Sequence, residues 1–298
     1  MKTIEQIIKT ADEKGLSSLS EYDSKKMLAA YGTPVVEERV ANTAEEALDA
    51  AARIGFPVVV KGLGSQLLHK TEMGLVHLKL QTKSAVIQAV EEISKAAGPD
   101  LEGYLVQPFV EGKRDWVAGV FRDPQFGPVI MFGVGGIFTE ALSDVAFRLA
   151  PLTQNDAADM LNEINVQALF NDFRGEKRVD REALVATLMG LSRLAVEHPR
   201  IAEIDINPLV TKKDGSLVAV DALVMLGDEV KTSIPKSPVG PEVLRPIFYP
   251  RSIAFVGASS KLGKWGHILV ANTISSGFQG NIFLVNAAGG TIAGREVY

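Results

Sequence analysis

The sequence predicts an α+β domain of two subdomains, followed by an incomplete α/β unit. Within residues 100–230 several strand-like runs follow one another while the helices come later, which is typical of antiparallel sheets with helices on one side. The segment 233–246 is rich in proline and predicts a linker. After this linker, strand, glycine loop and helix follow in the order of an α/β nucleotide-binding unit.

Composition limits the classes of protein to be considered. The 298-residue chain is long enough for two or three compact units. Its net charge of −5 gives no basic surface for nucleic acid. It has no cysteine and no apolar run of about 20 residues, and its N-terminus lacks the apolar core of a signal peptide. We therefore expect a cytoplasmic protein that binds neither nucleic acid nor a membrane.

The first subdomain is predicted from helix caps and apolar runs. Ser20 and Thr43 stand at the N-caps of two helices, which end near Gly32 and Gly55. The runs VVVK and VHLKL predict buried and half-buried strands, and another helix follows them. This helix–strand–strand–helix pattern predicts a small subdomain that ends near residues 98–103.

The second subdomain is predicted to begin at GYLVQPFV. Strands WVAGVFRD and PVIMFGVGG flank a Pro-Gln-Phe-Gly turn and predict an antiparallel meander. Thr153 is expected to cap one helix, and REALVATLMGLSRLAVEH predicts a longer one. A strand pair around IAEIDINPLV closes the domain, which we place at residues 1–232.

Residues 247–298 predict the N-terminal part of a Rossmann-like domain. A Rossmann-type sheet needs more strands than this segment supplies, so we expect a fragment of a longer protein. The glycine loop at Gly257, Ser259 and Gly263 lies between a strand and a helix, a context that favours binding of a nucleotide moiety. Its spacing differs from GxGxxG, which leaves NAD, CoA or no ligand open.

A hairpin in the second subdomain brings acidic and amide side chains together. Residues 202–221 predict two strands joined by a Lys-Asp-Gly turn, with polar side chains at Glu203, Asp205, Asn207 and Asp221. Carboxylates in so apolar a run are costly unless a cation meets them. Oxygen ligands without histidine or cysteine suit Mg²⁺ beside phosphates. These residues predict the part of an ATP site that binds the metal ion. The alternative is a strand pair whose acids face solvent or cap a turn.

Lys61 and the loop after it are candidates for binding phosphate. Lys61 ends an apolar strand, where a buried ammonium needs an anion; the alternative is a lysine that reaches solvent at the strand end. The glycines around Gly62 flank His69 and Lys70 and allow close approach to phosphate. His69 is a candidate phosphoryl acceptor because imidazole is nucleophilic near neutral pH. The alternative for His69 is a solvated loop histidine.

Two further segments carry polar residues of less specific meaning. Gly135 and Gly136 end a strand and predict either an anion-binding turn or a loop that requires positive φ. Asp144 and Arg148 alternate with apolar residues, which predicts a cross-strand ion pair.

The segment QPFVEGKRD, which joins the two subdomains, is a candidate for contacts with an adenine base and its ribose. Backbone groups near Gln107 and Val110 would meet the base, and Glu111 and Asp115 are equally good candidates for the ribose. The alternative for this segment is a charged surface loop.

Together these segments resemble the ADP-forming acyl-CoA synthetases, relatives of succinyl-CoA synthetase. Residues 10–230 resemble the ATP-grasp domain of that family, and residues 245–298 resemble the start of its CoA-binding domain. The matching segments are SEYDSKKMLAAYG, FPVVVKG, LLHKTEMGLV, FRDPQFGPVIMFGVGGIFTEALSDVAFRLAPL, EIDINPL and SIAFVGAS.

The resemblance implies an acid–thiol ligase that interconverts a carboxylic acid, CoA and ATP with acyl-CoA, ADP and phosphate. It implies acyl-phosphate and phosphohistidine intermediates, Mg²⁺ on Asn207 and Asp221, and phosphorylation of His69 as a second phosphohistidine. Lys61 would contact the ATP phosphates and Asp115 the ribose. The expected nucleotide- and CoA-binding residues are Lys61, Gly62, Lys70, Gln107, Val110, Asp115, Gly135, Gly136, Arg148, Gly257, Ser259 and Gly263.

The resemblance also implies partners. The principal phosphorylated histidine of the family lies in a CoA-ligase domain outside this chain, which would act in cis or in trans, and a homo-oligomer is expected. Two other functions are open. One is an enzyme in which acyl-CoA formation precedes a lyase step, and the other is a non-catalytic sensor of nucleotide or acyl-CoA.

Overall fold

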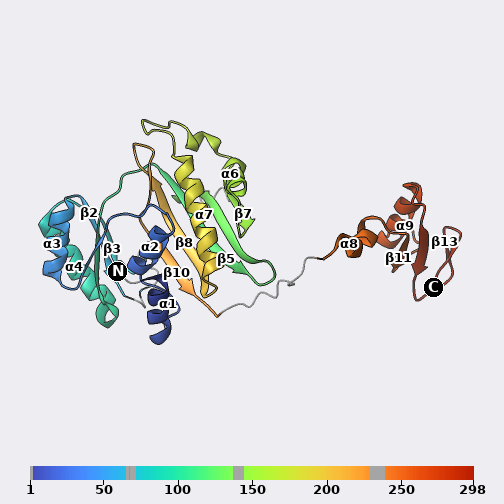
Figure 1. The fold of residues 1–298 in the computed structure, drawn as a ribbon, viewed down its shortest axis with the longest axis horizontal. Helices are drawn as coiled ribbons and strands as arrows, with labels where there is room; N and C mark the ends of the chain where they lie inside the picture. Colours follow the sequence, from blue (N-terminus) through green and yellow to red (C-terminus); the bar gives the residue numbers. More distant parts are fainter. Residues whose placement is uncertain (1–2, 65–66, 68–71, 137–143, 229–238) are drawn as a thin grey trace. The chain divides into compact units, whose positions relative to one another are not determined.

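The computed structural model describes residues 3–64, 67, 72–136, 144–228 and 239–298. The chain divides into two compact units, Met1–Thr232 and Ser233–Tyr298 (Figure 1). Within the described ranges, no helix is both long and apolar enough to cross a membrane.

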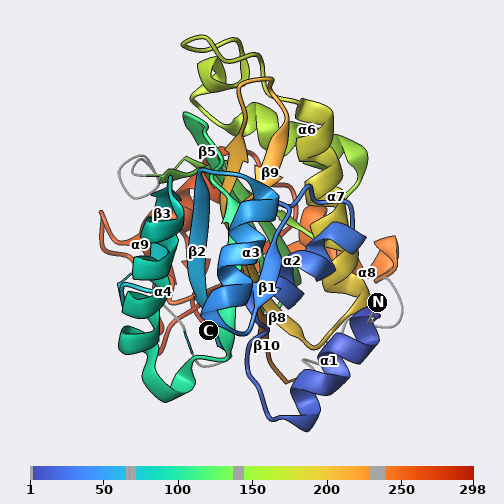
Figure 2. The same cartoon turned by 90° about the vertical axis from the view of Figure 1, so that its left-hand side faces the viewer.

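A small antiparallel sheet forms the first half of the larger unit. Its strand order is β1-β4-β2-β3, from Arg39–Ala41, Gly103–Pro108, Val58–Leu63 and Val76–Leu80. Helices α3 (Ala44–Ile54) and α4 (Lys83–Ala97) lie side by side over one face of this sheet (Figure 2). The predicted caps are present, since the Thr43 side chain accepts from the backbone of Glu46 and Gly55 ends α3.

Strand β4 corrects the predicted boundary between the subdomains. GYLVQP was expected to open the second subdomain, but it pairs with β2 in the register Val60 with Val106 and with β1 on its other side. The chain therefore crosses to the second sheet between Pro108 and Arg114 rather than near residues 98–103. The Gly98–Asp100 turn, a short 3-10 helix, leads back into the same sheet. The turn residues Gly98 and Pro99 mark the end of α4 but do not indicate to which sheet the next strand belongs.

A larger antiparallel sheet forms the second half of this unit. Its order is β10-β8-β5-β6-β7, with β9 also paired to β8. The strands are β5 (Arg114–Asp123), β6 (Gly127–Val134), β7 (Val145–Leu149), β8 (Ile201–Thr211), β9 (Leu217–Ala219) and β10 (Ala222–Leu226). The predicted meander and the strand pair around IAEIDINPLV are thus confirmed, as is the α+β class.

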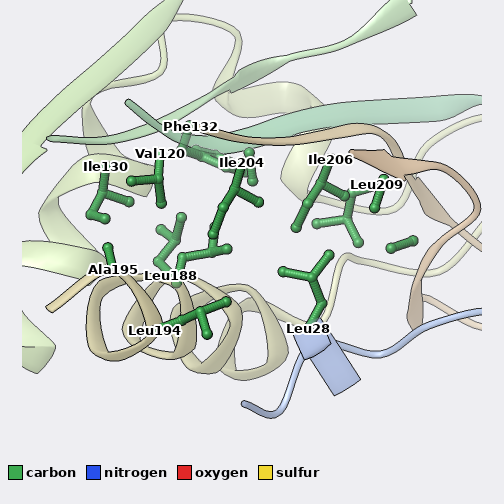
Figure 3. Packing of buried hydrophobic residues seen from close by; sticks show 14 of the residues in the cluster. Leu28, Val120, Ile130, Phe132, Leu188, Leu194, Ala195, Ile204, Ile206 and Leu209 are labelled. Carbon is green, nitrogen blue, oxygen red and sulfur yellow. The ribbon is translucent and has the colours of Figure 1, made fainter. Parts of the chain in front are cut away.

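Helices cover one face of the larger sheet. The covering helices are α1 (Ile4–Glu13), α2 (Glu21–Ala30), α6 (Gln154–Glu163) and α7 (Arg181–Glu197). Leu188 of α7 points toward Ile204 of β8, while Leu28 of α2 lies near Ile206 (Figure 3). Leu194 of α7 belongs to the same buried cluster. Because side chains alternate along a strand, Asp205, between these isoleucines, points to the opposite face.

The smaller unit is built around a parallel strand pair. Strands β11 (Ser252–Val256) and β12 (Asn281–Val285) are parallel, with α9 (Trp265–Ser275) between them in the sequence. A short hairpin, β13 (Thr291–Ile292) with β14 (Arg295–Glu296), follows. Its small core is formed by Ala258, Val270, Leu284, Ile292 and Val297.

Helix α8 (Pro241–Phe248) occupies part of the segment 233–246 that was predicted as a linker. Pro241 stands at the start of the helix, where the missing N–H of proline costs no hydrogen bond. Proline content therefore predicted the boundary between the two units, but the predicted linker extends to residue 246, whereas α8 already begins at Pro241.

Truncation of Leu194 should show how much the burial of α7 in this core stabilises the larger unit. Leu194 is fully buried, whereas Val196 on the same helix is 48% exposed. We expect Leu194→Ala to lower the free energy of unfolding by about 2–5 kcal/mol in urea titrations. Val196→Ala should change it by less than about 0.5 kcal/mol. Equal effects of the two substitutions would contradict this packing.

Candidate functional site

Strand register brings Asn207 and Asp221 together. Leu209 pairs with Ala219 and Ile206 with Ala222, and the same register places Asp221 opposite Asn207. Asn207 lies on the face of β8 opposite Ile206, and so does Asp205. Asn207 is exposed and the Asp221 side chain is 41% exposed, so both can reach a ligand.

Lys61 is buried beside Asp221. Its Nζ lies 2.6 Å from Glu21 Oε1, 3.0 Å from Asp221 Oδ2 and 3.0 Å from the Val220 carbonyl. These contacts engage all three donors of the ammonium. Burial alone would lower the pKa of Lys61, but the carboxylates of Glu21 and Asp221 outweigh it and the pKa is raised. The alternative in which Lys61 reaches solvent is therefore wrong.

A second buried lysine, Lys25 of α2, adjoins Lys61. Lys25 Nζ lies 2.9 Å from Glu21 Oε1, 2.9 Å from Gln107 Oε1 and 3.3 Å from the Val220 carbonyl, and it also pairs with Glu38. The role of this lysine was not predicted from the sequence. The available signal was spacing, because Glu21, Lys25 and Leu28 fall on one helix face and Leu28 is apolar.

The Val220 carbonyl is the centre of this buried polar network. Among the described residues it accepts from Lys61, from Lys25 and, at 3.2 Å, from Gln107 Nε2. Gln107 is 2% exposed, so its side chain serves the network rather than a bound base. The network joins α2, β2, β4 and the residue before Asp221, and thereby connects the two sheets.

The chemistry of Asn207 and Asp221 fits a hard divalent cation. Burial raises the pKa of the Asp205 carboxyl, and the nearby charges of Glu203 and Asp221 raise it further, which indicates a region of negative potential on this sheet face. In the part of the chain that is described, no group of three acidic or histidine side chains could hold a metal by itself. One carboxylate and one amide oxygen are what Mg²⁺ uses when phosphates complete its coordination.

Asp115 and the glycines after β6 also meet. The Gly135 amide donates to the Asp115 carbonyl at 2.7 Å, and a Cβ on Gly135 would lie 2.9 Å from the Asp115 carbonyl carbon. Gly136 has a φ of +71°, and a Cβ there would lie 3.4 Å from Asp115 Oδ2. Burial raises the pKa of Asp115, as does the charge of Glu176. Only glycine allows this close approach, so both readings of the glycine pair remain compatible with the structure.

Arg114, the residue before Asp115, is buried and binds the segment after α6. Arg114 is 2% exposed and its Nε donates to Glu176 Oε2 at 3.2 Å. Its Nη1 donates to the carbonyls of Leu169 at 3.0 Å and Asn171 at 2.9 Å. Arg114 thus fixes the segment after α6 against the start of β5.

Several predicted residues have other environments. Arg148 pairs with Glu163 of α6. The Asp144 carboxylate accepts from the backbone of Asn165 at 2.9 Å and of Val166 at 3.2 Å. The predicted Asp144–Arg148 ion pair is therefore wrong: each residue lies in or beside β7 and finds its partner in the α6 region.

Gly62 and Val110 also contribute to packing. Gly62 continues β2 rather than opening the loop, and a Cβ there would lie 3.2 Å from Ile93 Cγ2 under α4. Val110 packs against the small cluster of Val36, Val210 and Val218. His69 and Lys70 lie outside the described residues.

The predicted loop of the smaller unit follows β11. Gly257 and Gly263 have φ values of +88° and +81°. The Ser259 hydroxyl accepts from the backbone N–H of Lys261 at 3.1 Å. A Cβ on Gly266 would lie 2.2 Å from the Gly257 carbonyl, so the start of α9 packs directly on this loop. Its ligand stays a prediction.

Comparison with known proteins shows the family to which this chain belongs. The ATP-grasp domain family matches residues 10–226. The beta subunit of ADP-forming acetate–CoA ligase II from Pyrococcus furiosus is 40% identical over 233 residues, which is 76% of this chain and 97% of that subunit. The chain belongs to the ATP-grasp family of the ADP-forming acetate–CoA ligases.

Longer and structurally defined members of the family show the same relationship. ADP-forming acetate–CoA ligase II from Archaeoglobus fulgidus is 38% identical over 270 residues, but this chain spans only 38% of that enzyme. A structure of acetyl-coenzyme A synthetase 1 from Ca. Korarchaeum cryptofilum, in complex with coenzyme A and Ca-AMPCP, matches with a TM-score of 0.71 and 39% identity over 76% of this chain and 100% of that chain.

A second structure of this Korarchaeum protein contains coenzyme A and Mg-AMPPCP, with a phosphohistidine segment pointing towards the nucleotide-binding site. It matches with a TM-score of 0.66 and 37% identity over the same shares of the two chains.

Glu38 should make the stability of this ATP-grasp domain depend on pH. Burial raises the pKa of Glu38 from its ordinary 4.5 to about 7, although Lys25 lowers it. The native state therefore binds more protons than the unfolded state between these values, and stability falls as pH rises through about 7.

We expect the wild type to lose about 2 kcal/mol more unfolding free energy than Glu38→Gln between about pH 5 and about pH 8. Urea denaturation at the two pH values measures this difference. Parallel pH profiles of the two proteins would contradict the raised pKa.

Proposed function

We propose that this chain is the ATP-grasp portion of an ADP-forming acyl-CoA synthetase, which converts a carboxylic acid, CoA and ATP into acyl-CoA, ADP and phosphate and catalyses the reverse reaction. The observation that carries this proposal is the contact of Lys61, on β2 of the small sheet, with Asp221 of the larger sheet, which the strand register sets opposite Asn207. Two oxygen donors and a buried ammonium match the needs of a metal ion bound to nucleotide phosphates.

Asn207 and Asp221 would hold Mg²⁺, which neutralises charge on the phosphate oxygens when bound. Lys61 would contact those phosphates. Its three donors are already engaged, so a phosphate must replace one partner. Asp221 is the most exposed of the three partners and the one suited to turn toward a cation. Binding of the metal by Asp221 and binding of phosphate by Lys61 would therefore depend on each other.

The remaining assignments belong to the same proposal. Asp115, beside Gly135 and Gly136, would bind the ribose end of the nucleotide. The loop at Gly257, Ser259 and Gly263 would bind part of CoA through backbone N–H groups near the start of α9. The Korarchaeum relative, which contains CoA and Mg-AMPPCP, supports this choice of ligands.

The proposed reaction needs groups that lie outside the ATP-grasp domain. We infer that a CoA-ligase domain, in cis or in trans, supplies the principal phosphohistidine, and that His69 carries a phosphoryl group beside the nucleotide. The enzyme of Archaeoglobus fulgidus, of which this chain spans only 38%, is long enough for a partner domain in cis. We further propose a homo-oligomer that acts in the cytoplasm.

Calorimetric titration with ADP tests the nucleotide site directly. We expect Mg²⁺ to increase ADP affinity, and Asp221→Ala to abolish most of that increase, a loss of about tenfold to a hundredfold. Asp214→Ala is a matched control, because Asp214 is an exposed acid in the turn after β8. Affinity that is independent of Mg²⁺, or equally reduced in both variants, would contradict the proposal.

A further inference from the structure

Lys25 is a buried cation that the proposed reaction does not use. It is 1% exposed and its partners are Glu21, Glu38, Gln107 and the Val220 carbonyl. The Lys25–Val220 contact joins residues 195 positions apart. None of these partners is a predicted metal or phosphate ligand, but two of them adjoin such ligands: Val220 precedes Asp221, and Glu21 contacts Lys61.

Stability alone does not account for a lysine at this position. Replacing a buried ion pair with packed apolar side chains is often neutral or stabilising. Leu28, one turn along the same helix face, is fully buried in the apolar core. A methionine at position 25 would therefore satisfy the packing of α2, while leaving the polar groups around it without their cation.

Those polar groups determine where Lys61 and Asp221 lie. Glu21 Oε1 is shared between Lys25 at 2.9 Å and Lys61 at 2.6 Å. Without Lys25 the Glu21 carboxylate would have one fewer cation and would hold Lys61 more strongly. The Val220 carbonyl belongs to the peptide group that carries the N–H of Asp221, so the donors on this carbonyl fix the backbone direction at Asp221.

We propose that Lys25 is a positioning residue for the Mg²⁺–nucleotide site, which holds Glu21 and the Val220 carbonyl so that Lys61 and Asp221 are presented to phosphate and metal together. This inference rests on the proposed function. It deepens that function by assigning part of the metal site to the N-terminal helix α2.

The test compares the ADP affinity measured with Mg²⁺ to that measured without it, at about pH 8, where most of the Glu38 population is ionised. The main variant is Lys25→Met combined with Glu38→Gln, which removes both members of the pair and leaves no unpaired carboxylate at position 38. Leu28→Ala is the control for stability, because Leu28 lies on α2 outside the polar network. Glu38→Gln alone is the control that keeps the ammonium.

We expect the double variant to lose about tenfold or more of the Mg²⁺-dependent gain in affinity, as is usual when a residue that orients a metal ligand is removed. Leu28→Ala should lower the melting temperature but keep the wild-type increase of ADP affinity with Mg²⁺. Glu38→Gln alone should also keep this increase. If the double variant fails to fold, the same ratio of ADP affinities with and without Mg²⁺ is measured for Lys25→Arg. It retains the charge, and its planar guanidinium should still lose the gain because it cannot reproduce the contacts of a compact ammonium.

A wild-type gain in a folded Lys25 variant would overturn the positioning role. Absence of any Mg²⁺-dependent gain in the wild type would overturn the proposed function itself, and with it this inference. The two failures are thus distinguished by the wild-type titration alone.

Discussion

The hydrogen bonds to the Val220 carbonyl link the parts of the larger unit that must act together. Lys61 comes from β2, Gln107 from β4 and Lys25 from α2, while Val220 itself lies between β9 and β10. Two ammonium groups can be buried here because Glu21 lies between them and Asp221 and Glu38 flank them. Each charge has a partner, which is the condition for burying ionic groups without a large free-energy cost.

On the larger sheet, strand β8 packs against helices with one face and carries the candidate metal ligand Asn207 on the other. On one face Ile204 and Ile206 pack against α7 and α2, and this apolar core fixes the plane of β8. On the other face the alternation of the strand presents Asp205 and Asn207. The position of the candidate metal ligands is therefore a consequence of core packing, since a register shift of one residue would exchange the two faces.

Local signals predicted the elements better than their long-range partners. The caps at Thr43 and Gly55 are local hydrogen-bonding features, and both were found where the sequence placed them. The pairing of β4 with β2 was missed because strand order depends on the whole sheet. Lys25 was missed because its burial depends on Glu38, Gln107 and Val220, which are distant in the sequence. The polar face of β8 was predictable because IAEIDINPLV places polar side chains at alternate positions of an apolar strand.

Electron paramagnetic resonance with Mn²⁺ in place of Mg²⁺ tests most directly whether Asn207 and Asp221 bind a cation jointly with a nucleotide. The free-ion signal of Mn²⁺ should be lower with the protein and ADP together than with ADP alone or with the protein alone, because phosphates complete the coordination. Asp221→Ala should return the signal to the level measured with ADP alone. Tight Mn²⁺ binding without nucleotide, or binding that Asp221→Ala leaves unchanged, would contradict this account of the site.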